Sequence, residues 1–138
     1  MKITTQFVSD YQYASQNEEG NQQLLDMRPA GEKEHFSPTQ SLLGALAACA
    51  AVDIVQMMKK KRNQVDDLII ETSGVRRDED PRSFTEITQV FKLVSPDADA
   101  LAFEKVVALA VEKYCSVASS LSAEIKMTHR TEVHREAL

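Results

Sequence analysis

The sequence is poor in the residues on which several kinds of functional site depend. Its four glycines form no glycine-rich loop of the kind that wraps a phosphate, so a nucleotide site of that type is not expected. It has no Gly-x-Ser-x-Gly motif, the usual sign of an α/β-hydrolase. Its two cysteines and three histidines include no Cys-x-x-Cys pair and no His-x-x-x-His pair. No metal ion or other cofactor is therefore expected.

Positive charge is scarce as well. The 16 Lys and Arg residues are outnumbered by 21 Asp and Glu, and the formal net charge is -5. Because proteins that bind a phosphate backbone do so with clustered cations, nucleic acid is not an expected partner. The one basic run, residues 59–62, ends a helical pattern, where cations complement the negative end of the helix dipole. We favour that interpretation over a nucleic-acid or localisation signal.

Long hydrophobic runs are also missing. The longest, Leu42 to Val52, has 11 residues and ends at Asp53, whereas about 20 are needed to cross a bilayer. The first residues lack the apolar segment and cleavage site of a secretory signal. We therefore expect a cytoplasmic protein without membrane contact. In that compartment disulfides are usually transient and either catalytic or redox-sensing, which directs attention to the two cysteines.

The pattern of elements predicts an α+β fold in a single domain, residues 1–138. No regular βαβ alternation is present, so we expect a sheet built on antiparallel pairing. The alternating and helical patterns predict, in chain order, two or three strands within residues 1–27, a loop over 28–36, a helix from Pro38 to about Arg62, a β-hairpin over 67–75 and 83–94, a helix capped at 95–97, a short helix over 116–122 and a strand over 125–134.

The long helix has the clearest start signal. Ser37 is suited to the N-cap, Pro38 to the first helical position, and Gln40 to completing a capping box. The residues that follow are apolar on most sides, so the helix should be central and buried. One sheet and one or two short helices cannot cover it, and we infer that a second copy does so in a homodimer.

Cys49 lies in this helix, and its role is open on the pattern alone. Its spacing from Asp53, Gln56 and Lys60 places it on the least apolar face of the helix. Free cysteine is nevertheless among the most commonly buried residues, so packing remains an alternative to reactivity. A reactive thiol needs a neighbour that lowers its pKa, and Asp53 would raise it. The candidate activating cations in loops or strand ends are Arg28, Arg76, Arg77 and Arg82.

Cys115 has two interpretations of equal weight. A helix that starts at Ser116 would place Cys115 at a helix N-terminus, where the dipole favours a thiolate. Alternatively, Cys115 is ordinary core at the end of the preceding amphipathic helix. His129 falls on the inward face of the last strand, where a hydrogen-bonded structural histidine is commoner than a ligand, and His35 lies in a charged loop.

Three stretches resemble a known family. The helix SPTQSLLGALAACAAVDIVQMMKKKR, the later EKYCSV and the last alternating strand are similar to the OsmC/Ohr family of osmotically induced and organic-hydroperoxide-resistance proteins. The similarity runs from about Leu24 to Val133. The segments AVDIV and KYCSV place it closest to the OsmC-like branch.

The resemblance implies an intertwined homodimer and thiol-dependent reduction of organic hydroperoxides near the subunit interface. It implies that Cys49 is the peroxidatic thiolate and that Cys115 is the resolving thiol. The resulting intramolecular disulfide would be reduced by an external dithiol. It also implies that Arg28, in RPAGEKE, holds Cys49 as a thiolate.

One position departs from the family pattern. Thr39 stands where peroxidase members have a glutamate that orients the arginine, and Asp53 or Glu34 would have to substitute. The alternative function is a non-enzymatic module of the same fold that senses oxidants or binds a small hydrophobic ligand.

Overall fold

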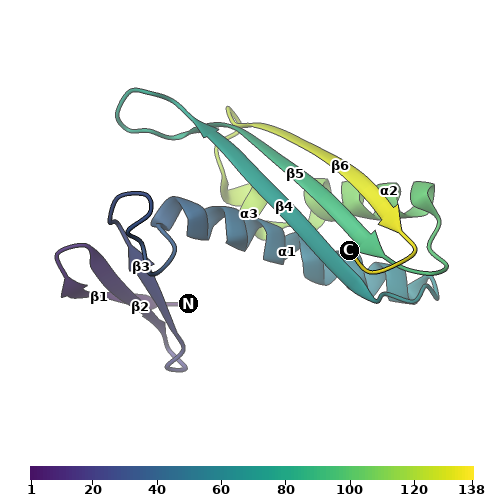
Figure 1. Ribbon diagram of the computed structural model, residues 1–138, viewed down its shortest axis with the longest axis horizontal. Coiled ribbons are helices and arrows are strands. Elements are labelled where there is room, and N and C mark those ends of the chain that lie inside the picture. Colours follow the sequence, from purple (N-terminus) through teal and green to yellow (C-terminus); the bar gives the residue numbers. More distant parts are fainter. The chain divides into compact units, whose positions relative to one another are not determined.

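The computed structural model describes residues 1–138, which separate into two compact units, Met1–Leu42 and Leu43–Leu138. Figure 1 labels the strands and α-helices of both units. In chain order the elements are β1 (Ile3–Ser9), β2 (Gln12–Asn17), β3 (Gln22–Asp26), α1 (Pro38–Lys60), β4 (Asp67–Arg76), β5 (Phe84–Val94), α2 (Ala100–Leu109), the π-helical turn η1 (Ala110–Tyr114), which has no label in the figure, α3 (Ser116–Ser120) and β6 (Lys126–His134).

The first unit holds a three-stranded antiparallel sheet in the order β1-β2-β3. The strands expected within residues 1–27 are therefore confirmed. Every residue of β1 is exposed, and Asp26 at the end of β3 is the only fully buried residue of the sheet. A sheet with so little apolar cover is held mainly by its ladder and by polar contacts around Asp26.

The second unit holds a sheet in the order β4-β5-β6. The expected hairpin is confirmed, with Asp67 opposite Val94 in an antiparallel ladder. The expectation of antiparallel pairing fails for the last strand, because β6 runs parallel to β5. The chain between these two strands forms α2, η1 and α3, and a crossover connection of that length returns the chain in the same direction.

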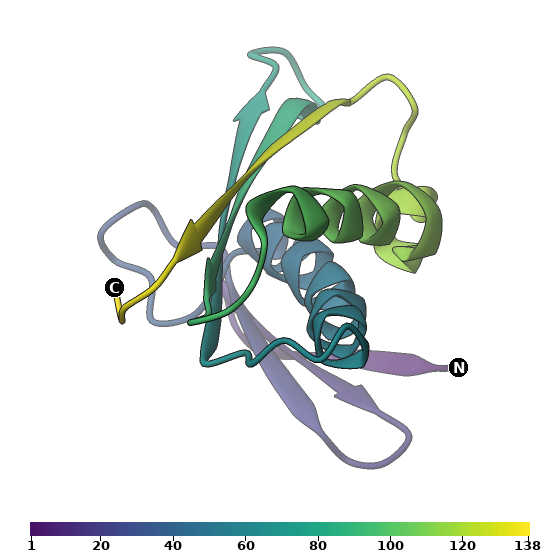
Figure 2. The ribbon, with the colours of Figure 1, turned by 90° about the vertical axis from the view of Figure 1, so that its right-hand side faces the viewer.

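The core of the second unit lies between this sheet and two helices. Figure 2 shows α2 and the adjoining part of α1 on one face of the sheet. Phe91 and Leu93 of β5 pack there against Phe103 of α2, and all three are fully buried. The residues that α1 buries recur every four positions, at Leu46, Ala50, Ile54 and Met58.

The start of α1 is confirmed in detail. The Ser37 main-chain N–H donates to Gln40 Oε1 at 2.9 Å, and the Gln40 N–H donates to Ser37 Oγ at 3.2 Å, which is the reciprocal capping box. The helix ends at Lys60, two residues earlier than expected.

Burial of α1 is narrower than we expected. By length and composition alone the helix could cross a membrane, yet one face packs in the core of the second unit. On the other side the Val52 side chain is 59% exposed. A single chain therefore covers one stripe of α1 and leaves an apolar stripe open.

The second helix begins later than predicted. Its N-cap is Asp99, whose carboxylate accepts from the Ala102 N–H at 2.9 Å. The segment that begins at Ser95 forms a turn instead, in which the Ser95 hydroxyl accepts from the Ala98 N–H at 3.0 Å. The same residue types cap a turn and a helix alike, because both present free N–H groups. The short helix after Cys115 is confirmed.

Candidate active site

Cys49 lies on the flank of α1 and is half-buried. It belongs to a small apolar cluster built on Leu46, Ile87 and Cys115, which are all buried. The two cysteines, 66 positions apart in the sequence, therefore meet in the second unit. Both are free thiols in this structure.

Cys115 is positioned by the chain on either side of it. Its N–H donates to the Ala110 carbonyl at 3.0 Å, a bond that closes the wide turn η1. Its backbone is extended, and its sulfur accepts from the Ala118 N–H at 3.4 Å as the N-cap of α3. The thiol donates weakly to the Leu46 carbonyl of α1, at 3.9 Å. Cys115 is thus both a helix cap and a core residue, the two alternatives left open by the sequence.

The two thiols differ in acidity. The pKa of Cys49 is lowered, chiefly by the main-chain N–H of Val117 and next by the thiol of Cys115. The pKa of Cys115 is raised, chiefly by burial, which disfavours the charged form. The first turn of α3 therefore favours a thiolate on Cys49, whereas we expected such a helix start to act on Cys115.

Asp53 opposes this effect, as the sequence suggested. Its charge raises the pKa of Cys49, although the hydrogen-bond donors outweigh it. None of the four candidate arginines is among the groups that shift the pKa of Cys49. Three of them lie in or next to the turn that joins β4 and β5. Arg76 donates to the Arg82 carbonyl at 2.7 Å, and Arg77 pairs with the Glu79 carboxylate at 3.2 Å.

Arg28, the fourth candidate, lies in the first unit within a cluster of carboxylates. Its guanidinium pairs with Asp26 at 3.0 Å and with Glu34 at 3.3 Å. Asp26 is completely buried, and it also accepts from the N–H groups of Arg28 and Glu34, each at 2.9 Å. These bonds, with the Arg28 side chain the largest cause, hold the pKa of Asp26 well below its usual range.

Arg28 is paired with carboxylates, although position 39 carries none. Thr39 makes only a 3.3 Å contact between its hydroxyl and that of Ser37. Glu34, which we named as a possible substitute, does pair with Arg28, whereas Asp26 was not foreseen. Its only sequence signal was a carboxylate two residues before the arginine, which is too common a pattern to single out.

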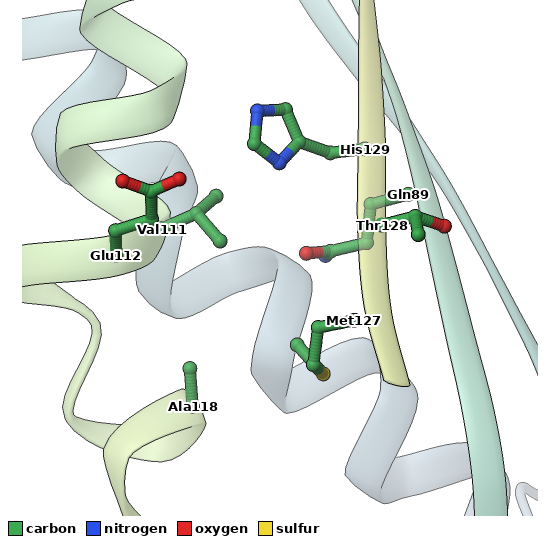
Figure 3. A pocket seen from close by; sticks show the side chains of 7 residues that line it. All are labelled: Gln89, Val111, Glu112, Ala118, Met127, Thr128 and His129. Atoms are coloured by element: carbon green, nitrogen blue, oxygen red, sulfur yellow. The ribbon is translucent and has the colours of Figure 1, made fainter. Parts of the chain in front are cut away.

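A pocket of about 410 Å³ borders the cysteine cluster. Its lining includes Ala118, whose N–H donates to the Cys115 sulfur, and Met127, which packs in the cluster. Figure 3 shows the Gln89 amide directed into this pocket and the His129 ring above it. His129 also lies edge-on to Phe91, with 6.3 Å between ring centroids. His129 therefore lies on the inward face of β6, as its alternation predicted, while Gln89, only 2% exposed, was not foreseen.

No group of three or more His, Cys, Asp or Glu side chains converges in a way that could hold a metal ion. The cluster itself offers two thiols and the main-chain N–H groups around them. A thiolate beside a second, protonated thiol can be oxidised to a sulfenic acid and then condense to a disulfide.

Comparison with known proteins identifies relatives. A family model described as OsmC-like protein matches residues 31–130. Protein YhfA of Escherichia coli strain K12 is 34% identical over 133 residues, which cover 96% of this chain and 98% of YhfA.

Solved structures share the fold. An OsmC like protein from Mycoplasma pneumoniae has a TM-score of 0.82 at 20% identity, covering 96% of this chain and 95% of that one. The organic hydroperoxide resistance protein OhrB of Bacillus subtilis has a TM-score of 0.63 at 16% identity, covering 95% and 96%. At such identities these two structures show the fold alone.

Proposed function

The chain belongs to the OsmC-like protein family, and on that premise we propose that it is a thiol-dependent peroxidase that reduces organic hydroperoxides. The observation that carries the proposal is a Cys49 thiol of lowered pKa packed in one cluster with a second thiol, Cys115. The name of OhrB links this fold to organic hydroperoxide resistance and gives further support. The proposed role is defence against oxidative or osmotic stress.

The reaction begins with the Cys49 thiolate. It attacks the outer oxygen of the hydroperoxide, the O–O bond breaks, Cys49 becomes a sulfenic acid, and the alkoxide takes a proton from solvent to leave as an alcohol. Cys115 then attacks the sulfenic sulfur and forms a disulfide, while its proton and the departing hydroxyl leave as water. An external dithiol reduces this disulfide and becomes a disulfide itself.

The surroundings suit each thiol to its step. The N–H groups at the start of α3 keep Cys49 charged and nucleophilic at neutral pH. Burial keeps Cys115 protonated, so that it does not compete for the peroxide. Arg28, as the family implies, stabilises the Cys49 thiolate, and Asp26 and Glu34 orient its guanidinium in place of a residue-39 carboxylate.

We further propose that the active protein is a homodimer in the cytoplasm, where dithiol reductants are available. The exposed side chains of Val52 on α1 and Phe7 on β1 support this assembly, because a second copy would remove such apolar surface from water. In that assembly the two units of each chain act as one OsmC-like domain.

A single assay series tests the proposal. With a dithiol reductant, the protein should consume cumene hydroperoxide and tert-butyl hydroperoxide, and Cys49→Ser should abolish turnover. Cys115→Ser is the matched control, because it should still consume one equivalent of peroxide and stop at a Cys49 sulfenic acid. Full activity of the Cys49→Ser protein would overturn the assignment.

A second function is favoured by one observation, the neutral Thr39 where peroxidase members carry a glutamate. On this alternative the protein is a non-enzymatic module that senses oxidants or holds a small hydrophobic ligand. Mild peroxide treatment separates the two, since the peroxidase should lose the mass of two hydrogens as Cys49 and Cys115 pair. An unchanged mass together with an ordinary Cys49 pKa would favour the binding module.

A further inference from the structure

A second pocket of the Leu43–Leu138 unit lies away from the cysteines, between the C-terminal end of α1 and the second half of α2. Its volume is about 300 Å³, at the lower end of the range for small-molecule sites. Lys60 is eleven residues from Cys49 along α1, which corresponds to about 16 Å. The lining residues are Met57, Lys60, Lys61, Lys105, Val106 and Leu109.

The base of this pocket is apolar. Val106 is 3% exposed and joins the main core, and the partly buried Met57 packs against that core. Leu109 is 40% exposed and offers an open hydrocarbon surface next to them. The base can therefore receive an alkyl chain without burying any polar group.

All the charged groups that line the pocket are cations. Lys60 ends α1, Lys61 follows it directly, and Lys105 lies on α2. None of these three lysines forms a salt bridge in the structure. The chain as a whole is acidic, with a net charge of -5. A helix dipole accounts for basic residues at the end of α1, but it does not account for Lys105 on the same rim.

We propose that this pocket binds a single-chain anionic amphiphile, such as an alkyl carboxylate. The alkyl chain lies on Met57, Val106 and Leu109, and the carboxylate is held by the lysines. The ligand is a free molecule rather than an anionic bilayer, because the net negative charge of the protein opposes approach to such a surface. The proposal does not depend on the thiol chemistry.

Calorimetric titration of the full chain with decanoate, kept below its micelle concentration, tests the site. Decanoate should bind in a saturable manner, and added salt should weaken binding as it screens the lysines. Decanol should bind more weakly because it lacks the charge, and acetate should not bind because it lacks the chain. Equal affinity for decanol and decanoate, or no saturable decanoate binding, would overturn the proposal.

A charge-matched pair of variants locates the site. The double variant Lys60→Gln/Lys105→Gln should weaken decanoate binding about tenfold, since each exposed charge contributes a few-fold. The control Lys59→Gln/Lys113→Gln removes two charges outside the pocket and should change the affinity less than about twofold. Equal losses of decanoate affinity in the two double variants would show only a general effect of charge and would overturn the assignment. Binding to phosphatidylglycerol vesicles without binding to decanoate would also overturn it, in favour of a membrane surface.

Discussion

The two units of the chain are held together by different forces. In the second unit a cluster of buried apolar side chains, with Phe91 and Phe103 at its centre, joins the sheet to two helices. In the first unit the only fully buried residue of the sheet is a carboxylate, Asp26, and its partners are Arg28 and Glu34. Most of the large apolar residues of the first sheet, such as Phe7 and Leu24, are exposed. Cohesion is thus mainly hydrophobic in one unit and mainly polar in the other.

The largest expected effect comes from the apolar core. Phe103→Ala removes a fully buried ring and should cost about 3–5 kcal/mol of unfolding free energy, measured by urea denaturation of the full chain. Leu101→Ala on the same helix removes a side chain that is 57% exposed and should cost less than about 0.5 kcal/mol. Similar losses for both variants would contradict the core described for the second unit.

The next effect tests whether the first unit contributes to the chemistry. If Arg28 stabilises the Cys49 thiolate, Arg28→Gln should lower kcat/KM about 100-fold and raise the pKa of Cys49, measured by the pH dependence of its alkylation rate. Arg76→Gln, in the β4–β5 turn, is the control and should leave both values unchanged. An unchanged Cys49 pKa in Arg28→Gln would leave the N–H groups of α3 as the source of activation.

At low pH the two units should lose stability through different carboxyl groups. The depressed pKa of Asp26 means that its stabilising contribution is complete above the unfolded-state pKa of about 3.9. That contribution is lost progressively as the pH falls below this value towards the folded-state pKa. Asp26→Asn should remove this acid sensitivity from the main-chain amides of β2 and β3. The measurement is the hydrogen-exchange rate of these amides as a function of pH. Asp97→Asn, which removes another carboxyl of lowered pKa, should alter the second unit instead.

A smaller effect is expected where α1 begins. Ser37→Ala removes the acceptor of the capping box and should cost about 1 kcal/mol of unfolding free energy. Gln40→Ala should cost a similar or smaller amount, and the double variant should cost less than the two together, because the residues serve one motif. If the shifts in urea midpoint of the two single variants add up to the shift of the double variant, the result would argue against reciprocal capping.

The smallest effect is expected on β1. Phe7→Ala should change the stability of dilute, monomeric protein by less than about 0.5 kcal/mol, because the ring is 61% exposed. If a second copy covers this face, the loss should grow with protein concentration in parallel with dimerisation, measured by sedimentation. A large loss in the monomer would show that the first unit has apolar cohesion of its own.

Much of the fold could be predicted because its signals are local. The capping box at Ser37, the β4–β5 hairpin and the short helix after Cys115 depend on residues a few positions apart, and the structure confirms each. The α+β class and the OsmC-like fold are confirmed as well. The direction of β6 could not be predicted from its alternating apolar and polar residues. The same pattern fits a strand that runs parallel or antiparallel to its neighbour.

The site was less predictable because its contacts are distant in sequence. That Cys49 and Cys115 share a cluster was implied only by family resemblance, and no pattern indicated that the Val117 N–H acts on Cys49. The burial of Asp26 could not be predicted either, since a carboxylate in a polar segment ordinarily faces solvent.

The parallel pairing of β5 with β6 also has a consequence for the order of folding. Glu86 pairs with Lys126 and Val94 with His134, so the ladder joins segments that are forty residues apart. Contacts of such long sequence separation form late, after the loop entropy between them has been overcome. Because Met127 of this strand packs on the cysteine cluster, the apolar wall around the two thiols should be completed only when β6 pairs with β5. The two thiols should therefore be more open to solvent before β6 docks than afterwards.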